Sequence, residues 1–312
     1  MKSSLLLSNI TCLDHAVLTT EGICGGSYMV SVEVSGETTS DEHVVVDFGT
    51  IKKTLKAIID DPEHGMDHKL WITDKDLAHS TSSTMEPSLI CVPVVGTEAY
   101  MIVPRNALHV LRDATSIELS LSLYLQERLR LQYPGVTVDK VHLSTKAVLS
   151  YMPGITLDNG PQWTSHPEYF RYAHGLKDST SWGCQNIAHG HLSYLQLVHR
   201  LPTVYKPEHC EDMIALSRLA KRISEDLNDT YFVAACNADN DDPYRVSYQS
   251  RDRGQFTLEL PRNAKVVYLH VETTIEYIVE YVHEVYGQEL YDLGVSRIII
   301  SEGLTKAAFK DL

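Results

Sequence analysis

The chain has 312 residues, which corresponds to two domains or one large domain at about 150 residues per domain. Its 27 basic and 41 acidic residues give a net charge of −14 with histidine neutral. This excess argues against proteins that bind nucleic acids or anionic membranes, because both classes need a cationic surface. Hydrophobic residues make up 43% of the chain, enough for a sizeable core, so wholesale disorder is excluded.

No apolar run approaches the roughly 18 residues of a membrane-spanning helix, so no membrane association is expected. The N-terminal residues contain only three consecutive leucines and soon turn polar, which is too short for a secretory signal. These features predict a cytoplasmic protein. Six cysteines in a chain of this length do not form a disulfide framework, so any special cysteine is expected to serve catalysis or metal binding.

The sequence contains an internal repeat. The tetrapeptide Pro-Arg-Asn-Ala at residues 104–107 returns 157 positions later, at residues 261–264. After each copy comes a segment with the amphipathic pattern of a helix, and then an apolar strand. An ordered series of matches at a nearly constant shift indicates that one structural unit has been duplicated.

Taken in chain order, each half predicts strand, strand, helix, strand, helix, strand. In the first half, alternating apolar and polar residues predict a strand over residues 28–34, and Asp47 is a helix-start signal before an amphipathic segment. The remaining predicted elements of this half are a helix over residues 119–129, a strand over residues 136–144 and an additional hairpin within residues 85–103.

The second half predicts the same order of elements, with a strand over residues 193–198 and a helix over residues 213–227. Its remaining predicted elements are a helix over residues 277–287, a strand over residues 295–303 and an additional hairpin within residues 244–260. Pro153 and Gly154 break the pattern, so we expect the boundary there. The two units are then residues 1–152 and residues 153–312.

A candidate metal site lies at the start of a strand in the second half. His189 and His191 flank Gly190, and residues i and i+2 of a strand point to the same face, so both imidazoles can share one metal ion. His174, on the preceding predicted strand, is the natural third ligand of a catalytic zinc site, which uses three protein ligands and one open position. The alternative is a pair of surface histidines and one core histidine.

Cys184 lies five residues before His189. A thiol next to a metal-bound substrate can act as a nucleophile or a base once it is ionised, and nearby cations favour its ionisation. The alternative is a buried cysteine that behaves as a small apolar residue.

Two further candidates carry acid–base groups. Asp67 directly precedes His68 in the first half, and a carboxylate there can orient the imidazole or receive its proton, although Asp-His pairs also occur without function. Glu302 follows an apolar strand, where a buried carboxylate needs a partner. It could accept two N–H bonds from the amino-imine edge of a guanine-like ring. The alternative is an exposed strand end.

Together these features resemble the family of 6-pyruvoyltetrahydropterin synthases and 6-carboxytetrahydropterin synthases, which have the tunnelling fold. That family has a first-strand histidine, a cysteine shortly before His-Gly-His, an Asp-Phe-Gly helix start, an Asp-His-Lys turn, a Thr-x-Glu helix start and a strand ending in glutamate. The residues that carry the resemblance here are Asp47, Phe48, Gly49, Asp67, His68 and Lys69, then His174, Cys184, His189, Gly190, His191, Thr274, Glu276 and Glu302. It covers most of both halves and predicts a tandem fusion of two family units.

The halves depart from the family pattern in complementary ways. The first half keeps a first-strand histidine as His15, but it has Cys24-Gly25-Gly26 in place of His-Gly-His and no glutamate at the end of its last strand. The second half has both features, but residues 227–230 are Leu-Asn-Asp-Thr in place of the Asp-His turn. Because the family joins the cysteine and the Asp-His pair across a subunit interface, we expect one composite active site per chain.

The resemblance implies an α+β protein of two tandem tunnelling-fold units, each an antiparallel four-stranded sheet with two helices on one face. It implies a zinc-dependent lyase that acts on a small-molecule pterin, 7,8-dihydroneopterin triphosphate. The implied Zn²⁺ ligands are His174, His189 and His191; the implied catalytic residues are Cys184, Asp67 and His68; and the implied substrate-binding residues are Glu302, Thr274 and Glu276.

The short Asp-Phe-Gly and Asp-His-Lys motifs favour the branch that releases acetaldehyde and gives 6-carboxytetrahydropterin, in queuosine and 7-deazaguanine synthesis, over the branch that gives 6-pyruvoyltetrahydropterin. Two alternatives stay open. One is a non-catalytic pterin- or purine-binding scaffold with structural zinc, and the other is a cyclohydrolase or nitrile reductase of the same fold. Cys184 beside the metal motif argues against both. Since family units close into rings of three that stack in pairs, we expect a homotrimer of tandem chains, or else a homohexamer.

Overall fold

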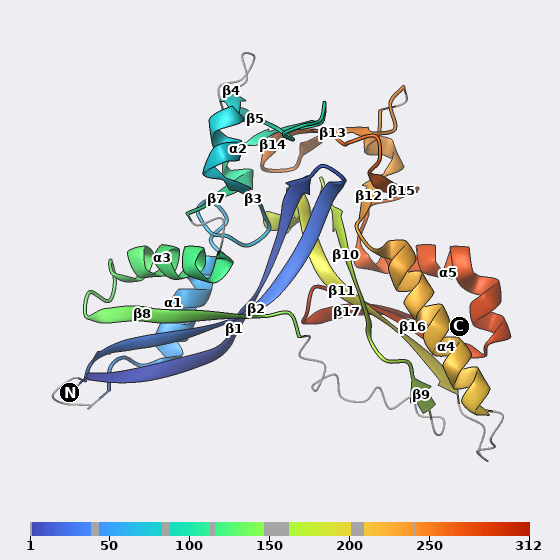
Figure 1. The fold of residues 1–312 in the computed structure, drawn as a ribbon, viewed down its shortest axis with the longest axis horizontal. Helices are drawn as coiled ribbons and strands as arrows, with labels where there is room; N and C mark the ends of the chain where they lie inside the picture. The colour runs from blue at the N-terminus through green and yellow to red at the C-terminus, as the bar shows by residue number, and fades with distance from the viewer. Residues whose placement is uncertain are drawn as a thin grey trace.

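The computed structural model describes residues 2–38, 44–82, 88–112, 116–146, 162–200, 209–239 and 241–312. The expected boundary between residues 152 and 153 lies outside these ranges. The main helices of the two halves lie on opposite sides of the molecule, with the long strands of both halves between them (Figure 1). The expected α+β class is confirmed. Within the described ranges, no helix is long and apolar enough to cross a membrane.

The first half contains β1 (Lys2–Thr19), β2 (Gly22–Glu37), α1 (Phe48–Ile59), β3 (Lys69–Thr73), α2 (Asp74–His79), β4 (Thr81–Ser82), β5 (Leu89–Pro93), β6 (Tyr100–Pro104), β7 (Leu108–Leu111), α3 (Ile117–Leu129) and β8 (Val136–Ser144). As predicted, α1 begins after Asp47, because the Asp47 carboxylate accepts the backbone N–H of Thr50 at 2.7 Å. Ile51, Leu55 and Ile59 follow at helical spacing and bury one face of α1.

The second half contains β9 (Gln162–Thr164), β10 (Glu168–His174), β11 (His189–Arg200), α4 (His209–Leu227), β12 (Thr230–Ala234), β13 (Arg245–Ser250), β14 (Gly254–Glu259), β15 (Lys265–Leu269), α5 (Ile275–Asp292), β16 (Val295–Glu302) and β17 (Lys306–Asp311). From β10 to β16 these elements follow the order of the first half. The repeated tetrapeptide directly precedes β7 in one half and β15 in the other, so it marks the same place in both.

The expectation of two antiparallel four-stranded sheets is wrong. The first half has a five-stranded sheet in the order β7-β3-β1-β2-β8, in which β3 pairs in parallel with both β1 and β7. The second half has a seven-stranded sheet in the order β15-β12-β10-β11-β16-β17, with β9 added beside β11. The parallel pairing was not predicted, because the strands that make it are only four or five residues long. Their pairing depends on crossovers through helices or hairpins rather than on a local turn.

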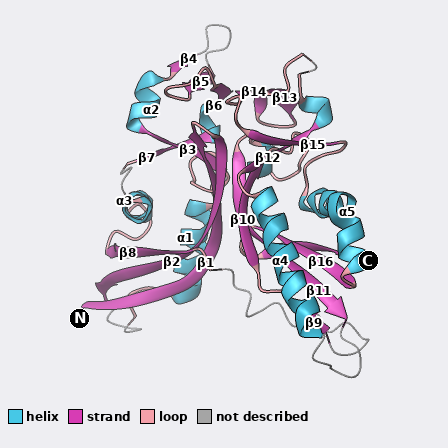
Figure 2. Ribbon diagram, turned by 45° about the vertical axis from the view of Figure 1, so that its right-hand side comes forward, coloured by secondary structure: helices cyan, strands magenta, loops and turns pink. Residues whose placement is uncertain are grey.

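The additional hairpins expected in both halves are present, and they join into a third sheet in the order β13-β14-β6-β5-β4 (Figure 2). The two halves meet where β14 pairs with β6, with Leu258 directly opposite Met101. Each of these residues lies three positions before its copy of the repeated tetrapeptide, so corresponding residues of the two halves face each other.

A second contact between corresponding residues lies where β2 crosses β11. A Cβ atom added to Gly190 would lie 2.5 Å from the Cα of Gly25, and one added to Gly25 would lie 2.5 Å from the backbone nitrogen of His191. Both glycines are central in the matching tripeptides at residues 24–26 and 189–191. The halves are therefore related by approximate two-fold symmetry, and a side chain at either glycine would push the strands apart.

Three of the hydrophobic clusters among the described residues hold these sheets together. Helices α1 and α3 pack on the first-half sheet, and α4 and α5 pack on the second-half sheet. The third core combines Ala16 and Ile72 of the first half with Ala173, Tyr231 and Phe256 of the second. Because this shared core is close-packed, it fixes the side chains of one half relative to those of the other.

Candidate active site and metal centre

Three buried histidines of the second half form a cluster. His174 is the last residue of β10 and pairs with His189, the first residue of β11, and His191 follows two residues later on the same face. The Nε2 atoms of His174 and His191 are 3.2 Å apart, and ring nitrogens of all three lie within 4.8 Å of one another. All three side chains are fully buried. The structure thus brings together the three residues that the sequence predicts as metal ligands.

Backbone carbonyl groups orient two of these rings. Nδ1 of His174 lies 2.6 Å from the carbonyl oxygen of Thr273, and Nδ1 of His189 lies 2.8 Å from that of Asn186. An N–H donated from Nδ1 leaves Nε2 as the atom with a free lone pair. Nε2 of His189 is buried and makes no hydrogen bond, which is the state expected of a metal-ligating nitrogen.

Burial favours the neutral form of His174 and His189. It lowers the pKa of His174 to about 3 and holds the pKa of His189 well below its ordinary value. Neutral imidazole is the form that binds a metal. The buried triad could therefore hold a divalent metal ion of the kind that imidazole ligands favour.

His68 of the first half lies beside this cluster. Its ring centroid is 5.3 Å from that of His189 and 6.0 Å from that of His191. One oxygen of the Asp67 carboxylate lies 2.7 Å from Nδ1 of His68, and the other accepts the backbone N–H of Asp14 at 2.8 Å. His68 itself has φ of 53° and donates its N–H to the carbonyl of Asp14 at 2.7 Å. This left-handed turn carries the imidazole of the first half to the metal cluster of the second.

Cys184 lies in the short helical turn Gly183–Gln185, between β10 and β11, and joins the same group. Its sulfur and ring nitrogens of His68 and His189 all lie within 4.8 Å of one another. Burial opposes protonation of His68, but the Asp67 carboxylate and Cys184 together raise the pKa of His68 well above its ordinary value. Burial alone would raise the pKa of the Cys184 thiol, but its contact with His68 lowers that pKa overall. Within one chain, the structure thus places a thiol with a lowered pKa beside an imidazole with a raised pKa, which favours ionisation of the thiol.

The loop that carries Cys184 is held by residues that the sequence analysis did not select. A Cβ atom added to Gly183 would lie 2.9 Å from the Cβ of His68, so the absence of a side chain permits the approach. Arg253, buried at 6% exposure, donates to the carbonyl oxygens of Trp182 and Gly183 at 3.4 and 3.3 Å. Its guanidinium also stacks 3.8 Å from the Trp182 ring. No motif marks Arg253, because it reaches the loop from the distant β13–β14 turn.

Two more contributing residues were missed. Asp14, on β1, places a carboxylate oxygen 3.4 Å from Nδ1 of His191. Asn186 donates from its side chain to the carbonyl oxygens of His68 and Ala107, at 3.1 Å each, and so ties the histidine loop to the first half. Neither belongs to a recognisable pattern, since each acts on a partner that is remote in the sequence.

The predicted ring-binding residues are less closely gathered. Glu302 ends β16, its carboxylate lies 3.2 Å from Nζ of Lys306, and its side chain is 16% exposed. Burial by itself would raise the pKa of Glu302. The positive charges of His191 and Lys306 more than offset this effect and lower the pKa below its ordinary value, so the carboxylate is ionised. Thr274 precedes α5, and Glu276 is exposed on the first turn of that helix. Within the described residues, no hydrogen bond or ion pair links Glu302 to Thr274 or Glu276.

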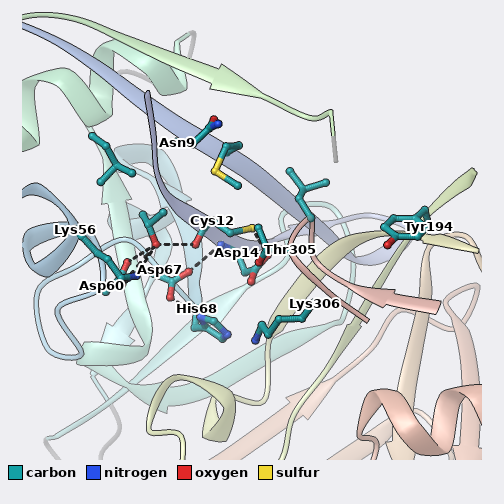
Figure 3. Close-up of a pocket in the computed structure, with 14 residues that line it drawn as sticks. Asn9, Cys12, Asp14, Lys56, Asp60, Asp67, His68, Tyr194, Thr305 and Lys306 are labelled. Carbon is teal, nitrogen blue, oxygen red and sulfur yellow. Dashed lines mark hydrogen bonds and ion pairs between the residues drawn. The ribbon is translucent and has the colours of Figure 1, made fainter. Parts of the chain in front are cut away.

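A pocket of about 550 Å³ opens beside the Asp67–His68 pair (Figure 3). Its charged lining residues are Asp14, Lys56, Asp60, Asp67, His68 and Lys306. This volume is within the range of small-molecule sites, about 300–1,000 Å³. Cys184, Glu302 and the histidine triad do not line the pocket, so it reaches the acid–base pair without reaching the metal cluster.

The corresponding place in the first half has no histidine triad. There the strand pairing sets Cys24 opposite Val17, at the position where the second half sets His189 opposite His174. Cysteine and valine thus occupy the positions of two metal ligands. Among the described residues, no group with the spacing of metal ligands includes either of them.

The interpretation of His15 as a retained first-strand ligand is wrong. His15 pairs with Gly26, so it is two residues away from the ligand position. Its ring is buried and stacks on Trp71 at 3.8 Å and on Tyr28 at 5.3 Å. A Cβ atom added to Gly26 would lie 2.4 Å from the His15 ring, so the imidazole fills the space that a second ligand would need.

Comparison with known protein families matches residues 11–148, which lie in the first half, to the family described as 6-pyruvoyl tetrahydropterin synthase. The comparison with curated proteins gave no match. Similar solved structures include the 6-pyruvoyl tetrahydropterin synthase of Plasmodium falciparum, at 17% identity and a TM-score of 0.36 over 49% of this chain and 100% of that one.

The Plasmodium vivax 6-pyruvoyl tetrahydropterin synthase matches at 13% identity and a TM-score of 0.33, over 49% of this chain and 98% of that one. An uncharacterised protein of Wolinella succinogenes matches at 14% identity and a TM-score of 0.32, over 48% and 97%. The assignment rests on the family match rather than on these structures. Residues 11–148, somewhat less than half of the chain, thus match the model of the 6-pyruvoyl tetrahydropterin synthase family.

Proposed function

We propose that the chain is a zinc-dependent lyase that acts on 7,8-dihydroneopterin triphosphate and forms 6-carboxytetrahydropterin. The observation that carries this proposal is the meeting of Cys184 and His68, from different halves, beside the buried histidine triad. The family match of residues 11–148 supports the substrate class.

The triad supplies the metal site in this proposal. His174, His189 and His191 would hold Zn²⁺ through three neutral imidazoles and leave one position for substrate. When bound, the ion acts as a Lewis acid toward the side-chain hydroxyls of the substrate.

Cys184 is the proposed base. As a thiolate it takes a carbon-bound proton of the substrate side chain, and the released electron pair forms the double bond as triphosphate leaves with its own bonding pair. Addition of one water and cleavage of the side-chain carbon–carbon bond then release acetaldehyde and leave the 6-carboxylate. His68, held in orientation by Asp67, stabilises the thiolate and exchanges protons with the substrate. The Asp67 carboxylate favours the protonated form of this imidazole, because it raises the pKa of His68.

The pterin ring requires a separate anchor. We propose Glu302, because its carboxylate is ionised and can accept two parallel N–H bonds from the ring. Thr274 and Glu276, at the start of α5, are the proposed secondary contacts. Substrate would reach His68 through the pocket lined by Asp67 and Lys306.

The contacts around Cys184 also weigh against a non-catalytic scaffold. A structural zinc site needs neither a thiol with a lowered pKa nor an imidazolium beside it. The choice of the carboxy product over the pyruvoyl product rests on the sequence motifs at Asp47 and Asp67.

The test is incubation of the purified protein with 7,8-dihydroneopterin triphosphate, with products identified by mass and metal measured on the same sample. We expect 6-carboxytetrahydropterin, acetaldehyde and about one zinc per chain. A 6-pyruvoyl product would contradict the choice of branch. No turnover with zinc bound would overturn the enzyme and favour the scaffold, and two zinc ions per chain would contradict a single composite site.

We also propose that three tandem chains form a homotrimer, equivalent to six family units. The approximate two-fold symmetry between the halves supports this assembly, because it already pairs two units within each chain. Light scattering should then give three times the chain mass of 35.0 kDa. A mass of six chains would support the homohexamer instead.

A further inference from the structure

Asp14 places a buried carboxylate of the first half against the metal cluster of the second. Its side chain is 4% exposed, and its Oδ1 lies 3.4 Å from Nδ1 of His191. His174 and His189 each present the same ring atom to a backbone carbonyl oxygen. Nδ1 of His191 is buried and makes no hydrogen bond within the described residues, and the Asp14 carboxylate is the ion-pair partner that faces it.

The carboxylate is enclosed on several sides. The Ser27 hydroxyl donates to Asp14 and itself accepts the backbone N–H of Leu192 at 2.9 Å, so one serine joins Asp14 to the strand of the metal ligands. A Cβ atom added to Gly303 would lie 2.9 Å from Oδ1 of Asp14, so the β16–β17 turn closes over the carboxylate. Within the described residues, its ion-pair partner is His191. A buried carboxylate is costly without such a partner.

The matching position in the second half supports a specific role. Asp14 accepts the backbone N–H of His68 through its carbonyl, and Arg171 accepts that of Asp229 in the same way. Asp14 and Arg171 are therefore corresponding residues, yet Arg171 is exposed. Its neighbourhood includes Cys24, at the place where the first half lacks a histidine triad. The carboxylate is present only on the side where the metal ligands are present.

We propose that Asp14 is a positioning residue for the metal. It accepts the Nδ1 hydrogen of His191, fixes the tautomer that leaves Nε2 free for the ion, and makes that nitrogen a stronger donor. The inference rests on the metal site of the proposed function. It gives the first half a second task beside the Asp67–His68 pair, so metal affinity depends on both halves.

The test is the affinity of the full-length protein for Zn²⁺, measured by competition with a chelator, in Asp14→Asn and in a control. Asp14→Asn keeps the backbone contacts to Asp67 and His68 and removes only the charge. We expect a loss of affinity of about 10–100-fold, as found for comparable outer partners of metal ligands. The control Asp229→Asn makes the same change of side chain on the turn that contacts Arg171 in the other half, and it should change affinity less than twofold.

Two further measurements keep the test decisive. Ser27→Ala leaves the carboxylate in place but removes the hydroxyl that fixes it, and we expect a smaller loss in the same direction. If Asp14→Asn does not fold, the Zn²⁺ affinity of Ser27→Ala decides the test by itself. At saturating Co²⁺, the visible spectrum of the Asp14 variant should shift, because the donor strength of His191 changes. Unchanged affinity in both variants would overturn the role of Asp14.

Together with the turnover assay, the affinities distinguish failure of the Asp14 proposal from failure of the proposed enzymatic function. Wild-type protein that binds zinc but turns over no pterin would remove the proposed function and leave the role of Asp14 to be decided by the affinities. If the wild type is active and Asp14→Asn binds Zn²⁺ with unchanged affinity, only the proposed role of Asp14 is contradicted. Wild type that binds no metal would overturn both.

Discussion

His68 and Asp229 occupy corresponding turns in the two halves and share one unusual backbone conformation, with φ of 53° and 56°. Each donates its backbone N–H to the neighbouring first strand of its own half, at 2.7 Å to Asp14 and at 2.8 Å to Arg171. The two turns therefore have the same backbone conformation but carry different side chains. Only the copy with the imidazole lies beside the histidine triad.

The first prediction concerns this turn. Asn adopts positive φ more readily than most residues, so His68→Asn should preserve the backbone and remove only the imidazole. We expect turnover to fall by about 10²–10⁴-fold, the range of a lost acid–base group, with metal content unchanged. Steady-state kinetics and metal analysis on one preparation measure both.

The matched control is Asp229→Asn, which introduces the same residue, asparagine, at the corresponding position of the other half. It should retain activity within about twofold, as surface changes usually do. Equal losses in the two variants would show that the halves do not divide the work as proposed.

The second prediction concerns the proposed base. Cys184→Ala should abolish detectable turnover, because no other described thiol lies within the His68–His189 group. Zinc should remain bound, since the triad is intact. Cys91→Ala, on β5 and half-buried, should be active. Full activity of the Cys184 variant would exclude that thiol from the reaction.

The third prediction concerns the glycine before this cysteine. A methyl group at residue 183 would lie 2.9 Å from Cβ and 3.0 Å from Cγ of His68, so Gly183→Ala should displace the imidazole. A misplacement of about 1 Å can cost about 10²-fold in rate, and we expect a loss of that order in kcat. Gly135→Ala is the control, because a Cβ atom there would meet nothing within 4 Å.

A double variant shows whether the glycine acts through the histidine. If it does, adding Gly183→Ala to His68→Asn should lower the rate little further, because coupled residues are not additive. Full additivity of the two losses would argue that Gly183 acts elsewhere, for example on Cys184 alone.

The fourth prediction concerns stability and pH. Burial lowers the pKa of His15 to about 3, from an ordinary value of 6.5. Below pH 6.5 the unfolded chain therefore binds a proton that the folded chain refuses, so the free energy of unfolding falls as the pH drops toward 3. His15→Leu should make that fall shallower, by up to about 1.4 kcal/mol per pH unit.

Urea unfolding between pH 6.5 and 4.5 measures this slope. The comparison uses differences between variants, so the contribution of other histidines cancels. His64→Leu, which replaces an imidazole with 60% side-chain exposure, is the matched control. Identical slopes for wild type and His15→Leu would contradict a neutral, buried His15.

The sequence by itself determined what is local or repeated. The repeat, the helix that begins after Asp47, the two extra hairpins and the buried histidine cluster of His174, His189 and His191 could all be predicted. Each depends on a short-range rule, such as helix capping, alternation along a strand or the shared face of residues i and i+2. The absence of a triad in the first half was also visible, because Cys24 and Gly26 stand where ligands would be.

The tertiary structure decided everything that depends on register and on contact between the halves. A shift of two residues along β1 turns His15 from an apparent ligand into a buried ring stacked on Trp71, and no local pattern specifies that register. The roles of Asp14 and Arg253 arise only where β1 meets β11 and where the β13–β14 turn meets the cysteine loop. Such contacts are set by the shared close-packed core, whose members come from both halves of the chain, and so they exist only once the chain has folded.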